Sequence, residues 1–256
     1  MSDKLIGTLA GLLFLFLTCV GWIVFGISGV PSPFDLLLGS IIAFAVTMSV
    51  LWLIYMLNVR VIMRQLERNL EKGVDSAISY LDAQLQLHPR FYNLVLMKMN
   101  FLVCGGYFEA FYTLFNQQAI ACDKKWARQP LYKSVRLIKL YLDFLNGQLN
   151  PEEVLQVAYI PSSPNKRADA PDVVSIIFVS YVNNDFQRSF TEAEKQCKVL
   201  TVDIFQFTLN YIMGLCKQQL GQPDEAQTYF DKLPQYAINQ LTKDLANQYA
   251  SSQPQN

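Results

Sequence analysis

The sequence has few of the residues from which enzyme and metal sites are usually built. It contains one histidine, His88, which precedes a proline in a predicted loop between helices and so does not favour a Ser-His-Asp or Cys-His arrangement. Its five cysteines are odd in number and form no close pair, which argues against a disulfide framework. We find no glycine-rich phosphate loop and no metal-ligand spacing. The sequence therefore predicts no catalytic site, no metal and no cofactor.

Charge is missing from two long stretches near the N-terminus. No charged residue occurs from Leu5 to Phe34 or from Leu36 to Val59, and only Asp35 separates them. About 20 apolar residues are enough to cross the hydrocarbon layer of a bilayer as a helix. We therefore predict a transmembrane hairpin. It covers residues 1–58, with spans at about 5–30 and 36–58 and a turn at 31–35.

Lysine and arginine are unequally distributed around these two stretches. Lys4 precedes the first and a basic run beginning at Arg60 follows the second, whereas the turn between them has neither residue type. An excess of Lys and Arg marks the cytoplasmic side. We expect both termini in the cytosol, in a multi-pass protein of a plasma membrane, and a bacterial source. A cleaved signal peptide over residues 1–30 is the competing interpretation, but it does not explain the second stretch.

Small residues recur four positions apart in both stretches, as Gly7 and Gly11 in the first and Gly39 and Ala43 in the second. This spacing lets two helix backbones approach closely in lipid. Packing of the two spans on each other is the favoured interpretation, and a homodimer through either face is the alternative. No acidic or basic side chain lies within the spans, so the sequence does not favour a substrate channel.

Residues 59–72 contain no helix breaker, so we expect the helix to continue out of the membrane until Gly73 ends it. Arg60, Arg64 and Arg68 would then share one face. That face would lie near lipid headgroups, where each basic residue gains about 1 kcal/mol from anionic lipid. An ordinary stop-transfer flank explains the same residues without a specific lipid and is the favoured interpretation.

Beyond residue 73 the pattern is one of successive helices. Apolar residues recur at spacings of three and four, as in Ile78, Leu81 and Leu85, and prolines or glycines separate the segments. The predicted divisions are a cytosolic helical domain at 73–250, a proline-rich loop at 160–171 that splits it, and a disordered polar tail at 251–256.

The stretch Val173–Val182 is a continuous apolar run rich in β-branched residues, which also fits a buried strand. No second strong strand pattern exists to pair with it, and an unpaired strand is not stable. We therefore predict a buried helix here and an all-α fold for the whole chain.

Helix pairs recur with a period of about 34 residues, which is typical of helical solenoids. The pattern Gly73–Ala77 recurs at Gly106–Ala110, and the pattern Phe190–Ala193 recurs at Pro223–Ala226. At each site an alanine opens the second helix of a hairpin. A bulky residue follows four positions later, at Leu81, Leu114, Cys197 and Phe230.

The unit Tyr211–Phe230 resembles a tetratricopeptide repeat. Its matching positions are Gly214, Gly221, Ala226 and Phe230. A second unit, Leu94–Leu114, matches at Phe101, Gly105, Ala110 and Leu114. The resemblance extends over residues 73–233 and implies an α-α solenoid, a right-handed superhelix whose concave face binds a protein or peptide.

The first helices of these two units supply the candidate partner-binding residues. They are Val95, Met99, Leu102, Tyr211, Leu215 and Gln218. The face of the Leu94 unit is apolar, unlike the basic face with which family members clamp a carboxylate. Burial by a neighbouring helix is the favoured interpretation, and a groove for an amphipathic helix is the alternative.

One basic cluster stands out in the middle of the chain. It consists of Lys124, Lys125, Arg128, Lys133, Arg136 and Lys139. A solvated helix flank is the favoured interpretation, followed by contact with an anionic membrane surface and by contact with an acidic partner. A nucleic acid is not predicted, because the net charge is zero.

Taken together, these patterns favour a non-enzymatic membrane-anchored adaptor whose cytosolic repeats bind a protein or peptide partner. Two alternatives stay open. One is an accessory subunit of a membrane complex, for transport or secretion, assembled through the hairpin. The other is an enzyme whose site is assembled from distant residues.

Overall fold

The computed structural model describes residues 33–89, 91–118, 125–129, 131–160 and 173–250, together with residues 8, 11, 13–16 and 120. Every element in these ranges is a helix, which confirms the all-α prediction. Val173–Val182 is helix α8 and not a strand. The chain divides into two compact units, Met1–Phe91 and Tyr92–Asn256.

Several predicted features lie outside the described residues. They are most of the first span at 5–30, Gly7, Lys124, nearly all of the loop at 160–171 and the tail at 251–256. Gly39 and Ala43 lie in helix α2, and Gly11 is exposed with nothing within 4 Å of the position that a Cβ would take. The predicted hairpin interface through these small residues stays a prediction.

Helix α2 (Pro33–Leu70) is a single helix of 38 residues. Its part Phe44–Leu70 has a mean hydropathy of 1.7 and is the one helix in the described residues that is long and apolar enough to cross a membrane. The helix begins inside the predicted turn, because Pro33 has the fixed φ that suits a first helical turn. It continues without a break through Arg60, Arg64 and Arg68.

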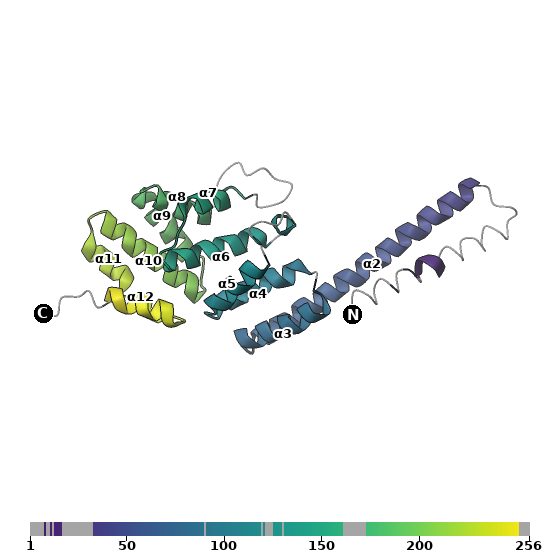
Figure 1. The fold of residues 1–256 in the computed structure, drawn as a ribbon, viewed down its shortest axis with the longest axis horizontal. Helices are drawn as coiled ribbons and strands as arrows, with labels where there is room; N and C mark the ends of the chain where they lie inside the picture. The colour runs from purple at the N-terminus through teal and green to yellow at the C-terminus, as the bar shows by residue number, and fades with distance from the viewer. Residues whose placement is uncertain are drawn as a thin grey trace. The chain divides into compact units, whose positions relative to one another are not determined.

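Helix α3 (Val74–Leu87) returns antiparallel along the basic end of α2 (Figure 1). Gly73 reverses the chain with a φ of +118°, a value that side chains rarely allow. Beside the turn, the Ser76 hydroxyl donates to Oδ1 of Asn69 at 3.0 Å. At the other end the rings of Tyr55 and Phe91 lie 6.2 Å apart. These two contacts fix the direction in which α3 runs.

The second unit is a series of helical hairpins followed by a final helix. The first two hairpins are α4 (Tyr92–Cys104) with α5 (Phe108–Gln117), and α6 (Tyr132–Leu145) with α7 (Pro151–Ala158). The next two are α8 (Val173–Val182) with α9 (Phe186–Cys197), and α10 (Asp203–Gln219) with α11 (Pro223–Phe230). The short turns η1 (Trp126–Arg128) and η2 (Leu233–Tyr236) precede α6 and α12 (Gln240–Ala250).

All four hairpins use the same turn. One residue has a positive φ, at Gly106, Gly147, Asn184 and Gly221. The residue after it donates its N–H to a carbonyl five positions back, as from Gln222 to Lys217 at 2.9 Å. This is the Schellman pattern, which satisfies the last carbonyls of a helix. The turns at residues 106, 147, 184 and 221 are 41, 37 and 37 residues apart.

The second helix of every hairpin also buries the same two positions. The fourth and eighth residues face the core: Phe111 and Phe115 in α5, Val154 and Ala158 in α7, Ser189 and Ala193 in α9, Ala226 and Phe230 in α11. All eight are at most 3% exposed. A structural repeat therefore exists, set by the turns.

The repeat differs in register from the one expected on sequence spacing. In the second unit, the positions that correspond from one hairpin to the next are the turns and not the alanines. Successive turns are farther apart than the predicted period of about 34 residues. Ala110, expected to lie between helices, is exposed, and its neighbour Phe111 is buried instead. Ala193 occupies the place of Phe230 and not that of Ala226.

The last hairpin has the closest helix contact. A Cβ built on Gly214 would lie 2.3 Å from Cε1 of Phe230, so the Phe230 ring packs directly on the backbone of α10. Ala226 and Phe230 are each 1% exposed. Glycine at position 214 is therefore required by the ring that covers it.

The two ends of this series meet. Helix α4 of the first hairpin packs on α10 of the last. The side-chain amide of Asn239, just before α12, donates to the Gly106 carbonyl at 3.0 Å, joining residues 133 positions apart. An extended superhelix would keep its first and last repeats apart. The second unit instead closes on itself.

Candidate functional site

Most of the face on which the resemblance implied a partner would bind is buried. Val95, Met99 and Leu102 on α4 are at most 6% exposed, and Tyr211 on α10 is 8% exposed. The Tyr211 ring lies against Phe144 and Tyr249, with centroids 5.6 and 5.2 Å away. The burial of the α4 residues agrees with the interpretation that was favoured for that face. Of the six predicted residues only Leu215, half-buried, and Gln218, exposed, reach the surface.

The basic cluster is divided between two environments. Lys125 is exposed, the backbone of Arg128 is part of η1, and Lys124 lies outside the described residues. Trp126 fixes η1, because its ring is buried and its Nε1 donates to the Gln118 carbonyl at 3.2 Å. The ring also packs edge-on against Tyr92, with centroids 4.8 Å apart.

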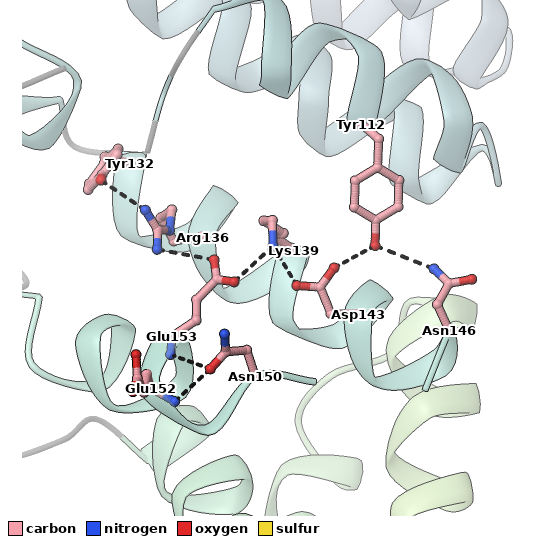
Figure 2. A network of polar contacts seen from close by, with 9 residues as sticks. All are labelled: Tyr112, Tyr132, Arg136, Lys139, Asp143, Asn146, Asn150, Glu152 and Glu153. Atoms are coloured by element: carbon pink, nitrogen blue, oxygen red, sulfur yellow. Dashed lines mark hydrogen bonds and ion pairs between the residues drawn. The ribbon is translucent and has the colours of Figure 1, made fainter. Parts of the chain in front are cut away.

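The other half of the cluster lies inside the second unit (Figure 2). Arg136 is 5% exposed, and its Nη2 donates to Oε1 of Glu153 at 3.1 Å. Lys139 donates to Oε2 of Glu153 at 3.0 Å and to Oδ2 of Asp143 at 2.5 Å. Lys133 donates to the Ile160 carbonyl at 2.8 Å. These cations bind groups of the chain itself and present no basic patch, so the solvated-flank interpretation does not describe them.

The network extends to α5 through Tyr112. Its hydroxyl donates to Oδ1 of Asp143 at 2.7 Å, and Asn146 donates to the same hydroxyl at 3.4 Å (Figure 2). Burial, with help from Asp143, raises the pKa of Tyr112 well above its usual value. Burial lowers the pKa of Lys139, but hydrogen bonds to Asp143 and Glu153 outweigh it and the net pKa is raised. Lys139 therefore stays charged at neutral pH.

A helix cap places the central carboxylate of this network. The side chain of Asn150 accepts the N–H groups of Glu152 and Glu153, at 2.9 and 3.5 Å, and so starts α7. Asn is a favoured N-cap residue, and acids such as Glu152 and Glu153 on the first turn suit the positive end of the helix dipole. The structure adds a second role for Glu153, which joins α7 to Arg136 and Lys139 of α6.

Sequence reasoning missed a cleft of about 550 Å³ between the N-terminal ends of α5 and α12. Its walls are Gly106, Tyr107, Phe108, Glu109, Ala110, Tyr112, Asn146, Asn239, Gln240 and Leu241. Tyr107 is 44% exposed at this site. The two walls are far apart in sequence and meet through Asn239, which donates to Gly106 and also accepts the Thr242 N–H at 3.0 Å as cap of α12.

The chemistry of the cleft suits binding. Its lining has one carboxylate, at Glu109, and two phenols, at Tyr107 and Tyr112, and the Tyr112 hydroxyl already donates to Asp143. Across the residues that the structure describes, no group of three or more His, Cys, Asp or Glu side chains is placed to hold a metal ion. A groove between two helix ends, with apolar and amide side chains, fits a peptide or a protein segment.

Comparisons with known proteins leave the family of this chain open. No family model matches it, and the searches of curated proteins and of solved structures give no match either. The resemblance to tetratricopeptide repeats therefore stands on the residues and on the repeated hairpins alone.

Proposed function

We propose that this chain is a non-enzymatic membrane-anchored adaptor whose helical-repeat unit binds a protein partner. Helix α2, which is apolar and largely exposed over Phe44–Leu57, supports the anchor. The repeated hairpins of the second unit support a binding scaffold. Anchoring a scaffold at a membrane raises the local concentration of its partners without any new contact.

The proposed anchor has two spans, at about 5–30 and 36–58, with both termini in the cytosol of a bacterial cell. The basic residues after the second span support this orientation. A cysteine placed in the turn at 31–33 is expected to react with an impermeant reagent added to intact cells, and one placed at position 250 is not. The opposite labelling pattern would remove the cytosolic assignment.

We place the partner at the cleft between α5 and α12. The cleft carries the proposal because most of the face expected on the α4 and α10 helices is buried. Its apolar floor and its amide side chains at Asn146 and Asn239 suit a partner segment with both apolar and backbone polar groups. The hydrogen bond from Asn239 to Gly106 holds the two walls in place before binding.

The test compares the same substitution at two exposed alanines, one inside the cleft and one outside it. Ala110 lines the cleft, whereas Ala83 lies on α3 of the first unit. A photo-crosslinking residue at Tyr107, in native membranes, is expected to capture a discrete partner. Ala110→Arg should abolish that crosslink because its side chain fills the cleft, and Ala83→Arg should leave it intact. A crosslink that survives Ala110→Arg contradicts the assignment of the cleft.

An accessory subunit of a transport or secretion complex is the second candidate. The exposed apolar side chains of α2, among them Phe44 at 58% and Trp52 at 63%, favour it because they offer a surface to another membrane helix as well as to lipid. Exchange of residues 1–58 for an unrelated hairpin separates the candidates. Loss of the partner favours the accessory subunit, and retention favours the adaptor.

A further inference from the structure

The exposed surface of α2 changes character over a short distance. Trp52, Tyr55 and Leu57 are each about half exposed or more, at 63%, 49% and 52%. From Arg60 onward arginines join the exposed surface, at Arg60, Arg64 and Arg68, with Val61 and Met63 exposed between them. Aromatic residues followed by basic ones mark the boundary between hydrocarbon and headgroups. If α2 spans a bilayer as proposed, this boundary lies between Tyr55 and Arg60.

The α2–α3 hairpin brings the chain back to that boundary. Helix α2 continues for 13 residues after Leu57, which is roughly 20 Å at the helical rise, and α3 has 14 residues, roughly 21 Å. The two helices run antiparallel, so α3 ends close to the level at which α2 leaves the apolar zone. The ring contact between Phe91 and Tyr55, at 6.2 Å, shows this directly.

The segment that returns carries exposed apolar side chains. Leu87 is 51% exposed at the end of α3, and Pro89, which has no N–H, is also exposed. His88 donates its N–H to Gln84 at 2.8 Å, and Phe91 donates its N–H to His88 at 3.0 Å. Satisfied backbone groups remove the main cost of placing an irregular segment near lipid.

The same helix is polar where it is far from the boundary. Near the Gly73 turn, the exposed residues of α3 are Asp75 and Ser79. Ile62 and Leu66 of α2 cover Ala77 and Leu81 between the helices, and all four are at most 4% exposed. The exposed residues of α3 therefore change from Asp75 and Ser79 near the turn to Gln86 and Leu87 at the end that lies level with the apolar part of α2.

We propose that Leu87, Pro89 and Phe91, at and just beyond the end of α3, contact lipid in the interfacial layer of the bilayer beside Tyr55. This inference rests on the proposed span of α2 and adds a second membrane contact to it. Its occupant is phospholipid, since the segment is continuous through Tyr55 with the surface that the span presents to hydrocarbon.

The test measures depth in the bilayer with the full-length protein in phosphatidylcholine vesicles. A fluorescent non-natural amino acid is placed at Leu87, at Ser79 or at Leu53, one position per sample. Vesicles carry a nitroxide quencher either on the headgroup or deep in the acyl chain. Ser79 is the matched control because it is exposed on the same helix, eight residues and roughly 12 Å nearer the turn.

We expect the probe at Leu87 to lose most of its emission to the headgroup quencher, while the probe at Ser79 keeps it. The probe at Leu53, in the span, should respond to the deep quencher. If Leu53 responds and Leu87 does not, the interfacial segment is wrong and the span stands. If Leu53 does not respond, the span itself fails, and the inference fails with it.

Discussion

Helices α2 and α10 both carry many large apolar side chains, yet they relate to their surroundings in opposite ways. Helix α10 buries nearly all of its length from Ile204 to Cys216. It even buries Thr208 and Asn210, whose side chains donate to carbonyls one turn earlier at 2.8 Å each. Helix α2 leaves Phe44 and Trp52 more than half exposed.

The difference lies in their neighbours as well as in their composition, since α10 includes polar residues such as Gln206 and Asn210. Helix α10 is enclosed by α9, α11, α4 and α6, so apolar side chains meet other apolar side chains. Within its described surroundings, α2 is covered by α3 only along its basic end, through Ile62 and Leu66. An exposed apolar helix of this length is long enough to cross a bilayer, which is the role proposed for α2.

The largest effect should come from exchanging aromatic residues on the two helices for alanine. Phe207 on α10 is 0% exposed, so Phe207→Ala should lower the free energy of unfolding by about 3–5 kcal/mol through lost contacts and a cavity. Trp52→Ala on α2 removes a larger side chain from an exposed site and should change the free energy of unfolding little. Denaturant titration in detergent measures both. Equal losses would mean that α2 is packed like α10.

Charge can be buried in the second unit only because it is paired there. Glu153→Gln leaves Arg136 and Lys139 with one carboxylate fewer and should lower the free energy of unfolding by about 2 kcal/mol. The loss is smaller than for a fully buried ion pair, because the Glu153 side chain is 20% exposed. The control is Glu192→Gln, whose partner Lys195 is 59% exposed, with an expected cost below about 0.5 kcal/mol. Similar costs in chemical unfolding would refute a role for the network in holding α6 to α7.

The close contact at Gly214 gives a smaller effect. Gly214→Ala places a Cβ 2.3 Å from the ring of Phe230, and the ring must move. The higher helix propensity of alanine offsets about 1 kcal/mol of the cost of moving the ring. We therefore expect a net loss of roughly 1–2 kcal/mol in the free energy of unfolding. Phe230→Leu should be less harmful in the Gly214→Ala background than alone. Additive costs in that double-mutant cycle would show that the two positions do not touch.

The smallest effect concerns alkaline pH. Burial raises the pKa of Cys216 from 9.0 to about 11, a rise that the Ser189 hydrogen bond partly offsets. A folded pKa above the unfolded one gives stability that is complete below pH 9 and is lost as pH rises towards 11. Cys216→Ala should make the loss of unfolding free energy between pH 8 and 10.5 smaller by roughly 1–2 kcal/mol. Its Tm should therefore fall less over this pH range than the Tm of the unchanged protein. Parallel curves for the two proteins would contradict it.

Local signals in the sequence were sufficient for the helices and their ends. Asn150 caps α7 and Asp185 caps α9, whose Arg188 N–H lies 3.2 Å from Oδ1 of Asp185, as expected for residues of that type. The helix expected at 173–182 is present, and Gly73 follows the end of α2. Capping, periodicity and breakers act over one or two turns of chain, so one sequence reveals them.

Features that depend on distant partners were not visible. Gly73 and Gly106, which the sequence spacing paired, both have a positive φ, but the later turns use Gly147 and Asn184. Asn184 is not a glycine, so alanine spacing gave the wrong register within the second unit. The pairing of Arg136 with Glu153 needs α6 and α7 in contact. The cleft depends on the hydrogen bond from Asn239 to Gly106, for which no local pattern exists.

The most direct test of the account is an accessibility profile along α2 in the full-length protein in vesicles. A nitroxide side chain is placed at successive positions from Ile41 to Arg68, and its relaxation by dissolved oxygen and by a water-soluble nickel complex is compared. The expected profile shows oxygen dominant through Leu57 and the nickel complex dominant from Arg60 onward. Strong relaxation by the nickel complex throughout 41–57 would contradict a membrane-spanning α2.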